Sequence, residues 1–158
     1  MKPFVRRQIQ RLLPISLVFL LFGFWIASPA QANISEKSIK LHEEARDYLV
    51  KGNYKSAVIQ LKNAIRADPD NVQARFDLAT IYLRGRDGAS AEKELKAARK
   101  RGMPEDSILL FLAQAYSLQG KNHKILDEIS SENRPDNLAA GALAARAGAY
   151  VALKRLED

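Results

Sequence analysis

Two histidines and two short loop motifs have the residue types that chemistry would need. His42 and His123 are too few and too widely spaced to form a metal site, and His42 has no matched nucleophile. The segment GRDGAS at 85–90 lacks the lysine of a phosphate-binding loop. The segment DPDN at 68–71 lacks the glycine and the terminal glutamate of a calcium loop. Both segments are predicted to be turns.

The chain of 158 residues contains no cysteine, which excludes disulfides, thiolate zinc sites and cysteine nucleophiles. No convergent acid, base or nucleophile set is visible. We therefore expect no catalytic residue, no metal and no cofactor, and we interpret the chain as a non-enzymatic protein. A hydrophobic fraction of 47% is enough to build a core.

The net charge of +7 is largely an N-terminal effect, because Lys2, Arg6, Arg7 and Arg11 precede the first acidic residue and leave +3 for the remainder. A second basic run lies at 93–102. Cations at 99–101 in the last turn of a helix complement the helix dipole, and Glu92 with Lys96 forms an i, i+4 pair. We favour this interpretation over contact with an anionic polysaccharide or lipid headgroup. Nucleic acid is not an expected partner.

Residues 1–32 have the three parts of a secretory signal peptide. A positive segment ends at Arg11, an uncharged apolar run follows from Leu12 to about Ala27, and small residues stand at Ala30 and Ala32. Cleavage is expected after Ala32, which would place the remainder outside the cytoplasm. The alternative is an uncleaved segment that anchors the chain in the inner membrane, which would be its only membrane contact.

A regular repeat organises the rest of the chain. Ala45, Ala79, Ala113 and Ala147 are spaced by 34, and so are Tyr48, Tyr82, Tyr116 and Tyr150. Each copy is predicted to be two antiparallel helices. The first carries apolar residues at 41, 45, 48 and 49 and ends at Gly52, and the second carries an apolar stripe over 54–65. One hairpin cannot cover its own apolar faces, so neighbouring hairpins are expected to stack.

The repeat resembles the tetratricopeptide repeat (TPR) family, which has small residues at three fixed positions, an aromatic residue and a late proline. The matching residues in the first copy are Ala45, Tyr48, Gly52, Tyr54, Ala57, Ala64 and Pro69. The resemblance implies an all-α helix-turn-helix solenoid, a right-handed superhelix. Its repeats are expected at 38–71, 72–105 and 106–139, the last with a degenerate second helix, and residues 140–158 begin a fourth.

A narrower resemblance concerns residues 87–129, which are similar to TPR proteins of the PEP-CTERM/exosortase system. It implies a role in exopolysaccharide export or surface-protein sorting in the cell envelope of a Gram-negative bacterium, with the exported chain in the periplasm. The lipid-bearing cysteine common in that group is absent here. The fourth first-helix is rich in alanine and leucine, so we expect the chain to be the front fragment of a longer array.

Repeats of this family bind partners on the inner faces of their first helices. By repeat register, the candidates for a partner groove are His42, Arg46, Leu49, Phe76, Thr80, Leu83, Leu110, Gln114 and Ser117. The family's carboxylate-clamp version has lysine and asparagine at places that here hold other residues, so that specialisation is not expected. The mixed, half-apolar set favours a peptide segment of envelope or export machinery. Direct contact with polysaccharide is the alternative.

Overall fold

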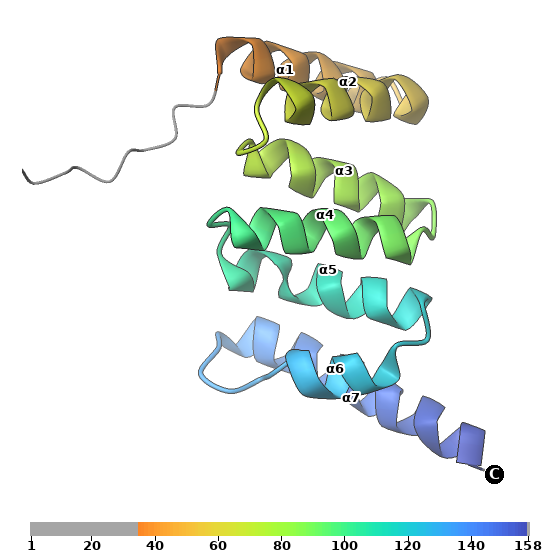
Figure 1. Ribbon diagram of the computed structural model, residues 1–158. Coiled ribbons are helices and arrows are strands. Elements are labelled where there is room, and N and C mark those ends of the chain that lie inside the picture. Colours follow the sequence, from red (N-terminus) through yellow and green to blue (C-terminus); the bar gives the residue numbers. More distant parts are fainter. Residues whose placement is uncertain (1–34, 158) are drawn as a thin grey trace, which may run out of the picture. The chain divides into compact units, whose positions relative to one another are not determined.

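The computed structural model describes residues 35–157, which form seven helices and no strand (Figure 1). The helices are α1 (Glu36–Val50), α2 (Tyr54–Ala67), α3 (Val72–Arg84), α4 (Gly88–Lys100), α5 (Glu105–Leu118), α6 (Asn122–Glu128) and α7 (Asp136–Glu157). Each helix packs against the next along the chain, and α3 also contacts α5, which in turn contacts α7. The predicted all-α helix-turn-helix solenoid is confirmed.

The predicted signal peptide, including Ala30 and Ala32, lies outside the described residues. Within 35–157, no helix is both long enough and apolar enough to cross a membrane.

Side-chain caps set where the first four helices begin. Ser35, Asn53, Asn71 and Asp87 each accept a hydrogen bond from the backbone N–H three residues further on. Such caps satisfy N–H groups that have no partner inside the helix. The Asp87 carboxylate accepts from Ser90, and this bond holds the pKa of Asp87 below its ordinary value. Neither α5 nor α6 has a side-chain cap, and α6 extends for seven residues only.

The same left-handed backbone position joins the two helices of each pair. Gly52, Arg86 and Gly120 stand at the same position of successive repeats and have φ angles of 70°, 59° and 67°. Glycine adopts this conformation without steric penalty, whereas a side chain at Cβ crowds the following carbonyl. Arg86 therefore carries a strain that the two glycines avoid.

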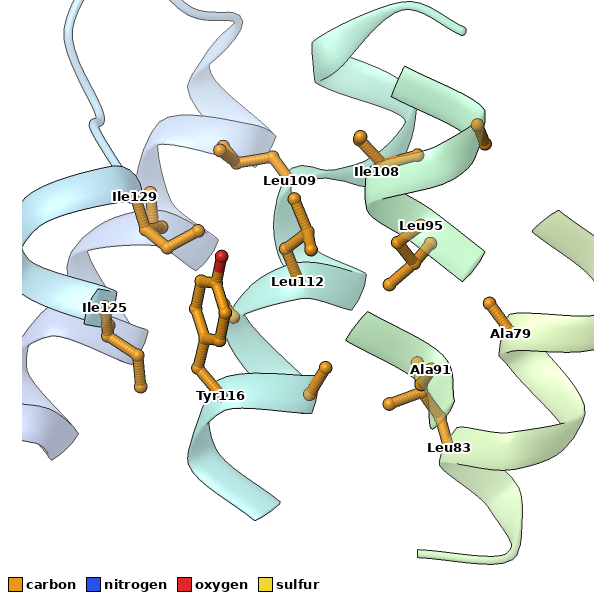
Figure 2. Close-up of a cluster of buried hydrophobic side chains, with 14 of the residues drawn as sticks. Ala79, Leu83, Ala91, Leu95, Ile108, Leu109, Leu112, Tyr116, Ile125 and Ile129 are labelled. Carbon is orange, nitrogen blue, oxygen red and sulfur yellow. The ribbon is translucent and has the colours of Figure 1, made fainter. Parts of the chain in front are cut away.

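Small residues let the paired helices approach closely. Ala45 of α1 and Ala57, Leu61 and Ala64 of α2 are all fully buried. A second buried cluster runs from α3 to α7, with Leu95, Leu112, Tyr116 and Ile129 among its largest members (Figure 2). Tyr82 packs against both clusters, so the apolar core continues from one helix pair to the next.

Two of the repeat-equivalent tyrosines, Tyr82 and Tyr116, lie beside equivalent lysines. The Lys62 ammonium lies 6.0 Å from the centroid of the Tyr82 ring, and the Lys96 ammonium lies 5.4 Å from that of Tyr116. The two lysines share one repeat position, and the two tyrosines share another. The same lysine–tyrosine contact therefore joins the first helix pair to the second and the second to the third.

The third pair departs from the first two. Its second helix, α6, ends at Glu128, and a loop leads to α7. Arg134 ties this loop to the start of α5 by donating to Glu105, Asp106 and the Ser130 carbonyl. The loop brings α7 against both α5 and α6.

Candidate functional site

The predicted groove residues lie on the first helices of the three pairs. His42, Arg46 and Leu49 are on α1, Phe76, Thr80 and Leu83 on α3, and Leu110, Gln114 and Ser117 on α5. Because His42 of α1 contacts Asp77 of α3, α3 contacts α5 and α5 contacts α7, these first helices form a continuous row. Two cavities open along it.

The first cavity, of about 320 Å³, brings together four of the predicted residues: Leu49, Thr80, Leu83 and Gln114. Tyr54, Ile81, Arg84 and Phe111 complete its lining. Leu83 is buried and contributes to the floor, whereas Gln114 is exposed. Sequence reasoning missed the second group because the repeat register selected only three positions on each first helix, and Tyr54 belongs to a second helix.

The second cavity, of about 620 Å³, lies between α5, α6 and α7 and is lined by three predicted residues, Leu110, Gln114 and Ser117. Small residues of α7 leave the space open. Gly141 approaches so closely that a Cβ atom there would stand 2.8 Å from Leu110 Cδ1. Gln114 lines both cavities, so they adjoin at this side chain.

His42 and Arg46 line neither of these cavities. The His42 Nε2 atom lies 2.6 Å from Asp77 Oδ2, and the His42 side chain is only 13% exposed. The imidazole thus connects α1 to α3. Arg46 lies in a separate depression of about 430 Å³ with Glu43, Asp47 and Val50.

The contacts of α1 with α3 and of α3 with α5 involve equivalent repeat positions. His42 pairs with Asp77, and Phe76 packs edge-on against Phe111 with ring centroids 4.8 Å apart. The two pairs have the same separation in the sequence. Leu110 then meets α7 at Gly141. The contacts between first helices therefore change from polar between α1 and α3, through aromatic between α3 and α5, to aliphatic between α5 and α7.

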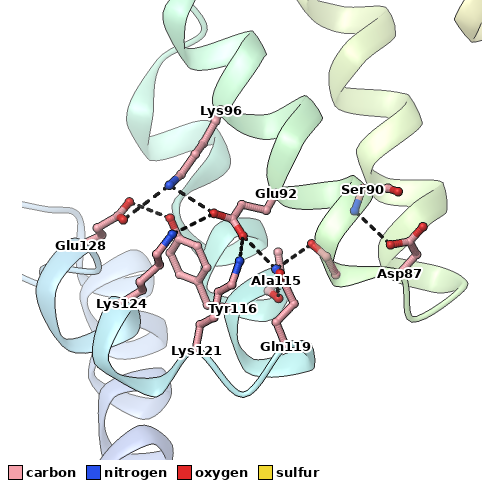
Figure 3. A network of polar contacts seen from close by, with 11 residues as sticks. Asp87, Ser90, Glu92, Lys96, Ala115, Tyr116, Gln119, Lys121, Lys124 and Glu128 are labelled. Carbon is pink, nitrogen blue, oxygen red and sulfur yellow. Dashed lines mark hydrogen bonds and ion pairs between the residues drawn. The ribbon is translucent and has the colours of Figure 1, made fainter.

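A network of polar contacts joins the second helix pair to the third, and its residues line neither cavity (Figure 3). Glu92 is 8% exposed and accepts hydrogen bonds from Lys121, Gln119 and Lys124 at 2.6, 2.9 and 3.2 Å. Lys96 lies 3.2 Å from the same carboxylate. Burial alone would raise the pKa of Glu92, but these donors together lower it to about 2.

Tyr116 and Glu128 extend this network. The Tyr116 hydroxyl donates to Glu128 across 2.6 Å, and burial together with this carboxylate raises the pKa of the phenol. The predicted Glu92–Lys96 pair is confirmed. The other lysines were not foreseen, because they lie on the degenerate part of the third copy. These contacts hold helices together and involve no reacting group.

The remaining motifs are structural. Arg99 and Lys100 are in the last turn of α4, as predicted, and Arg101 pairs with Asp70 at 3.2 Å. Asp68 accepts from the backbone N–H groups of Ser35 and Asp70, so 68–71 is a turn that also fixes the start of α1. Among the described residues, no group of three or more acidic or histidine side chains is placed to hold a metal ion.

Comparison with known families agrees with this geometry. The sequence model of the tetratricopeptide repeat family matches residues 42–105, from within α1 to the start of α5. Repeats of this family generally mediate protein–protein interaction and are typically non-enzymatic scaffolds. The match supports a tetratricopeptide-repeat protein. Among curated proteins, none matches the chain.

Proposed function

We propose that this chain is an exported, non-enzymatic scaffold that binds a segment of another protein in the groove formed by its first helices. The observation that carries the proposal is the pair of adjoining cavities that share Gln114. Both cavities have apolar walls with a few polar side chains. This arrangement suits an extended or helical segment whose apolar side chains insert into the cavities.

The chemistry of the groove describes the expected partner segment. Leu49, Phe111 and Leu110 offer apolar contacts, while Thr80 and Gln114 offer hydrogen bonds to peptide groups. The small residues of α7 make the second cavity the roomier one, so it is expected to accept the largest apolar side chain.

The cellular setting in the proposal is the cell envelope, in exopolysaccharide export or in the sorting of PEP-CTERM proteins. It is supported by the signal-like pattern of residues 1–32 and by the resemblance of residues 87–129. Expression in a Gram-negative host, followed by fractionation and N-terminal sequencing, tests the first part. A periplasmic chain that begins at Asn33 supports export, whereas a full-length chain in the cytoplasm contradicts it.

A protein segment is favoured over polysaccharide as the groove's ligand. Sugar rings stack on exposed flat aromatic faces, but Phe76 is half-buried and packs edge-on against Phe111 at an interplanar angle of 80°. This geometry places an aromatic wall, rather than a platform, beside the cavities.

Affinity capture from envelope extract tests the proposal. The wild-type chain is expected to retain protein partners after treatment with polysaccharide-degrading enzymes. The double substitution Thr80→Glu with Gln114→Glu should abolish this retention, because it puts two charges into the groove. Ala89→Glu, on the exposed surface of α4 outside both cavities, is the matched control. Equal retention by the double variant and the control, both folded by circular dichroism, would refute the groove assignment.

A further inference from the structure

The second helices of the first two pairs, α2 and α4, carry basic residues at the same repeat positions. Four positions, spaced four, three and four residues apart, lie along one side of each helix. In α2 they hold Lys55, Ile59, Lys62 and Arg66. In α4 they hold Ala89, Lys93, Lys96 and Lys100. We call these two sets the basic stripes; all their residues except Lys96 are exposed, and none lines either groove cavity.

Acidic side chains of the same helices do not offset the charge of the stripes. The α2 helix contains no acidic residue. The α4 helix contains Glu92 and Glu94, which are only 8% and 9% exposed and pair with Lys96 and Arg75 respectively. Among residues 35–157, no ion pair includes the three cations of the α2 stripe, nor Lys93 or Lys100 of the α4 stripe. These cations are therefore available to an external anion.

Helix stability does not account for the stripes. Cations at 99–101 complement the dipole at the last turn of α4, but Lys93 stands in the middle of that helix. Lys55 is the second residue of α2, where the positive end of the dipole disfavours a cation. The basic run at 93–102 is thus one part of a repeated surface, and the other part lies on α2.

The two stripes lie on the same side of the array. Lys62 contacts the ring of Tyr82 on α3, and Lys96 makes the equivalent contact with Tyr116 on α5. Each stripe therefore has the same position relative to the helix pair that follows it, and the two together cover a surface two helices wide. The pattern ends on α6, where Asp127 occupies the repeat position of Ile59 and Lys93.

We propose that the basic stripes hold the chain against an anionic lipid surface, at the level of the headgroups. A membrane presents negative charge in two dimensions, which suits cations spread over two helices. Ile59 is 60% exposed in the middle of the α2 stripe, where it can enter the boundary between headgroups and acyl chains. An acidic polysaccharide presents charge along a line and gains little from an isoleucine. The contact uses no groove residue, so the proposal does not depend on the groove.

Sedimentation of the full chain with lipid vesicles tests the proposal. The probes are vesicles of phosphatidylcholine mixed with phosphatidylglycerol, and vesicles of phosphatidylcholine alone. The chain is expected to prefer the mixed vesicles, and the stripe variant Lys55→Glu with Lys93→Glu should bind them more weakly by roughly tenfold or more. Ile59→Gln should weaken binding by about threefold or more, because it removes the apolar contact. Added salt should weaken it as well.

Lys40→Glu with Lys154→Glu is the matched control. These lysines are exposed on α1 and α7, outside the stripes, and their replacement makes the same change in net charge. The control should lose far less binding than the stripe variant, both being folded by circular dichroism. The cations of residues 1–32 can also attract anionic lipid, but they are the same in every chain. The difference between the two double variants therefore reports the stripes alone.

Two outcomes would overturn the proposal. One is equal binding of the stripe variant and the control to the mixed vesicles. The other is binding of the wild-type chain to immobilised alginate, an acidic polysaccharide, at a salt concentration at which it no longer binds the mixed vesicles. The stripes would then belong to a polysaccharide and not to a lipid surface.

Discussion

At the scale of single residues, one repeat position holds a residue type that its backbone conformation disfavours. Position 86 requires the left-handed backbone that Gly52 and Gly120 provide, yet it holds arginine. The sequence predicts a turn at 85–90, but only 85–87 join the helices, because α4 already begins at Gly88. It does not reveal the strain, since only the φ angle of 59° shows that Arg86 rather than Gly85 takes this conformation.

Arg86→Gly is therefore expected to raise the free energy of unfolding by about 0.5–1 kcal/mol, the strain relieved less the extra entropy of glycine in the unfolded chain. Gly52→Ala is the reverse experiment. A Cβ atom there meets nothing within 4 Å, so only backbone strain opposes it, and stability should fall by about 1 kcal/mol. Urea denaturation measures both. A loss of stability in Arg86→Gly would contradict the assignment.

Glu92 is the residue with the clearest pH signature. Its pKa falls from an ordinary 4.5 to about 2 in the folded chain, so the carboxylate stabilises the fold fully above pH 4.5. That contribution is lost as the pH drops from 4.5 towards 2. Glu92→Gln should lower the free energy of unfolding by about 1–3 kcal/mol at pH 7 and flatten its decline in this acid range.

Guanidinium denaturation across pH 2–7 checks the expectation. Glu132→Gln, at an exposed site in the loop after α6, is the control and should follow the wild-type profile. Parallel profiles for wild type and Glu92→Gln would show that the lysines around Glu92 do not lower its pKa.

At the scale of helices, the repeat period predicts the pairing well. Apolar spacing and the turn residues indicate α1 to α4, because most residue types in those copies agree with their positions. The third copy was harder to predict. Lys121 stands where Asn53 and Asp87 cap their helices, so α6 starts without a side-chain cap, and Arg134 holds the loop that follows. Such contacts depend on distant residues that a local pattern does not reveal.

Replacing alanine by leucine at two equivalent repeat positions distinguishes a covered helix face from an uncovered one. Ala79 of α3 is fully buried beneath α4, so Ala79→Leu should lower the free energy of unfolding by about 1–3 kcal/mol through overpacking. Ala147 has the same repeat position on α7 but is exposed, so Ala147→Leu should change stability by less than about 0.5 kcal/mol. Thermal unfolding of both variants makes the comparison. Equal losses would mean that the face of α7 is covered after all.

At the scale of the whole molecule, the repeat register predicted which helices carry the candidate groove but not how its residues are distributed. Leu49, Thr80, Leu83 and Gln114 line one cavity, and Leu110 and Ser117 join Gln114 in the second. His42 and Arg46 lie apart from both, since His42 faces Asp77 on the next first helix. Which side of a first helix faces the groove thus depends on how far each helix is turned against its neighbour, which the period alone does not determine.

The central claim is that the row of first helices binds a protein segment, and photo-crosslinking tests it most directly. One chain carries a photoreactive amino acid at position 114, where the two cavities meet, and a control chain carries it at position 89 on α4. Both chains are irradiated in envelope extract. The account predicts a protein adduct from position 114 that position 89 does not give and that an excess of unlabelled chain suppresses. The same adducts from both positions, or none from position 114, would contradict it.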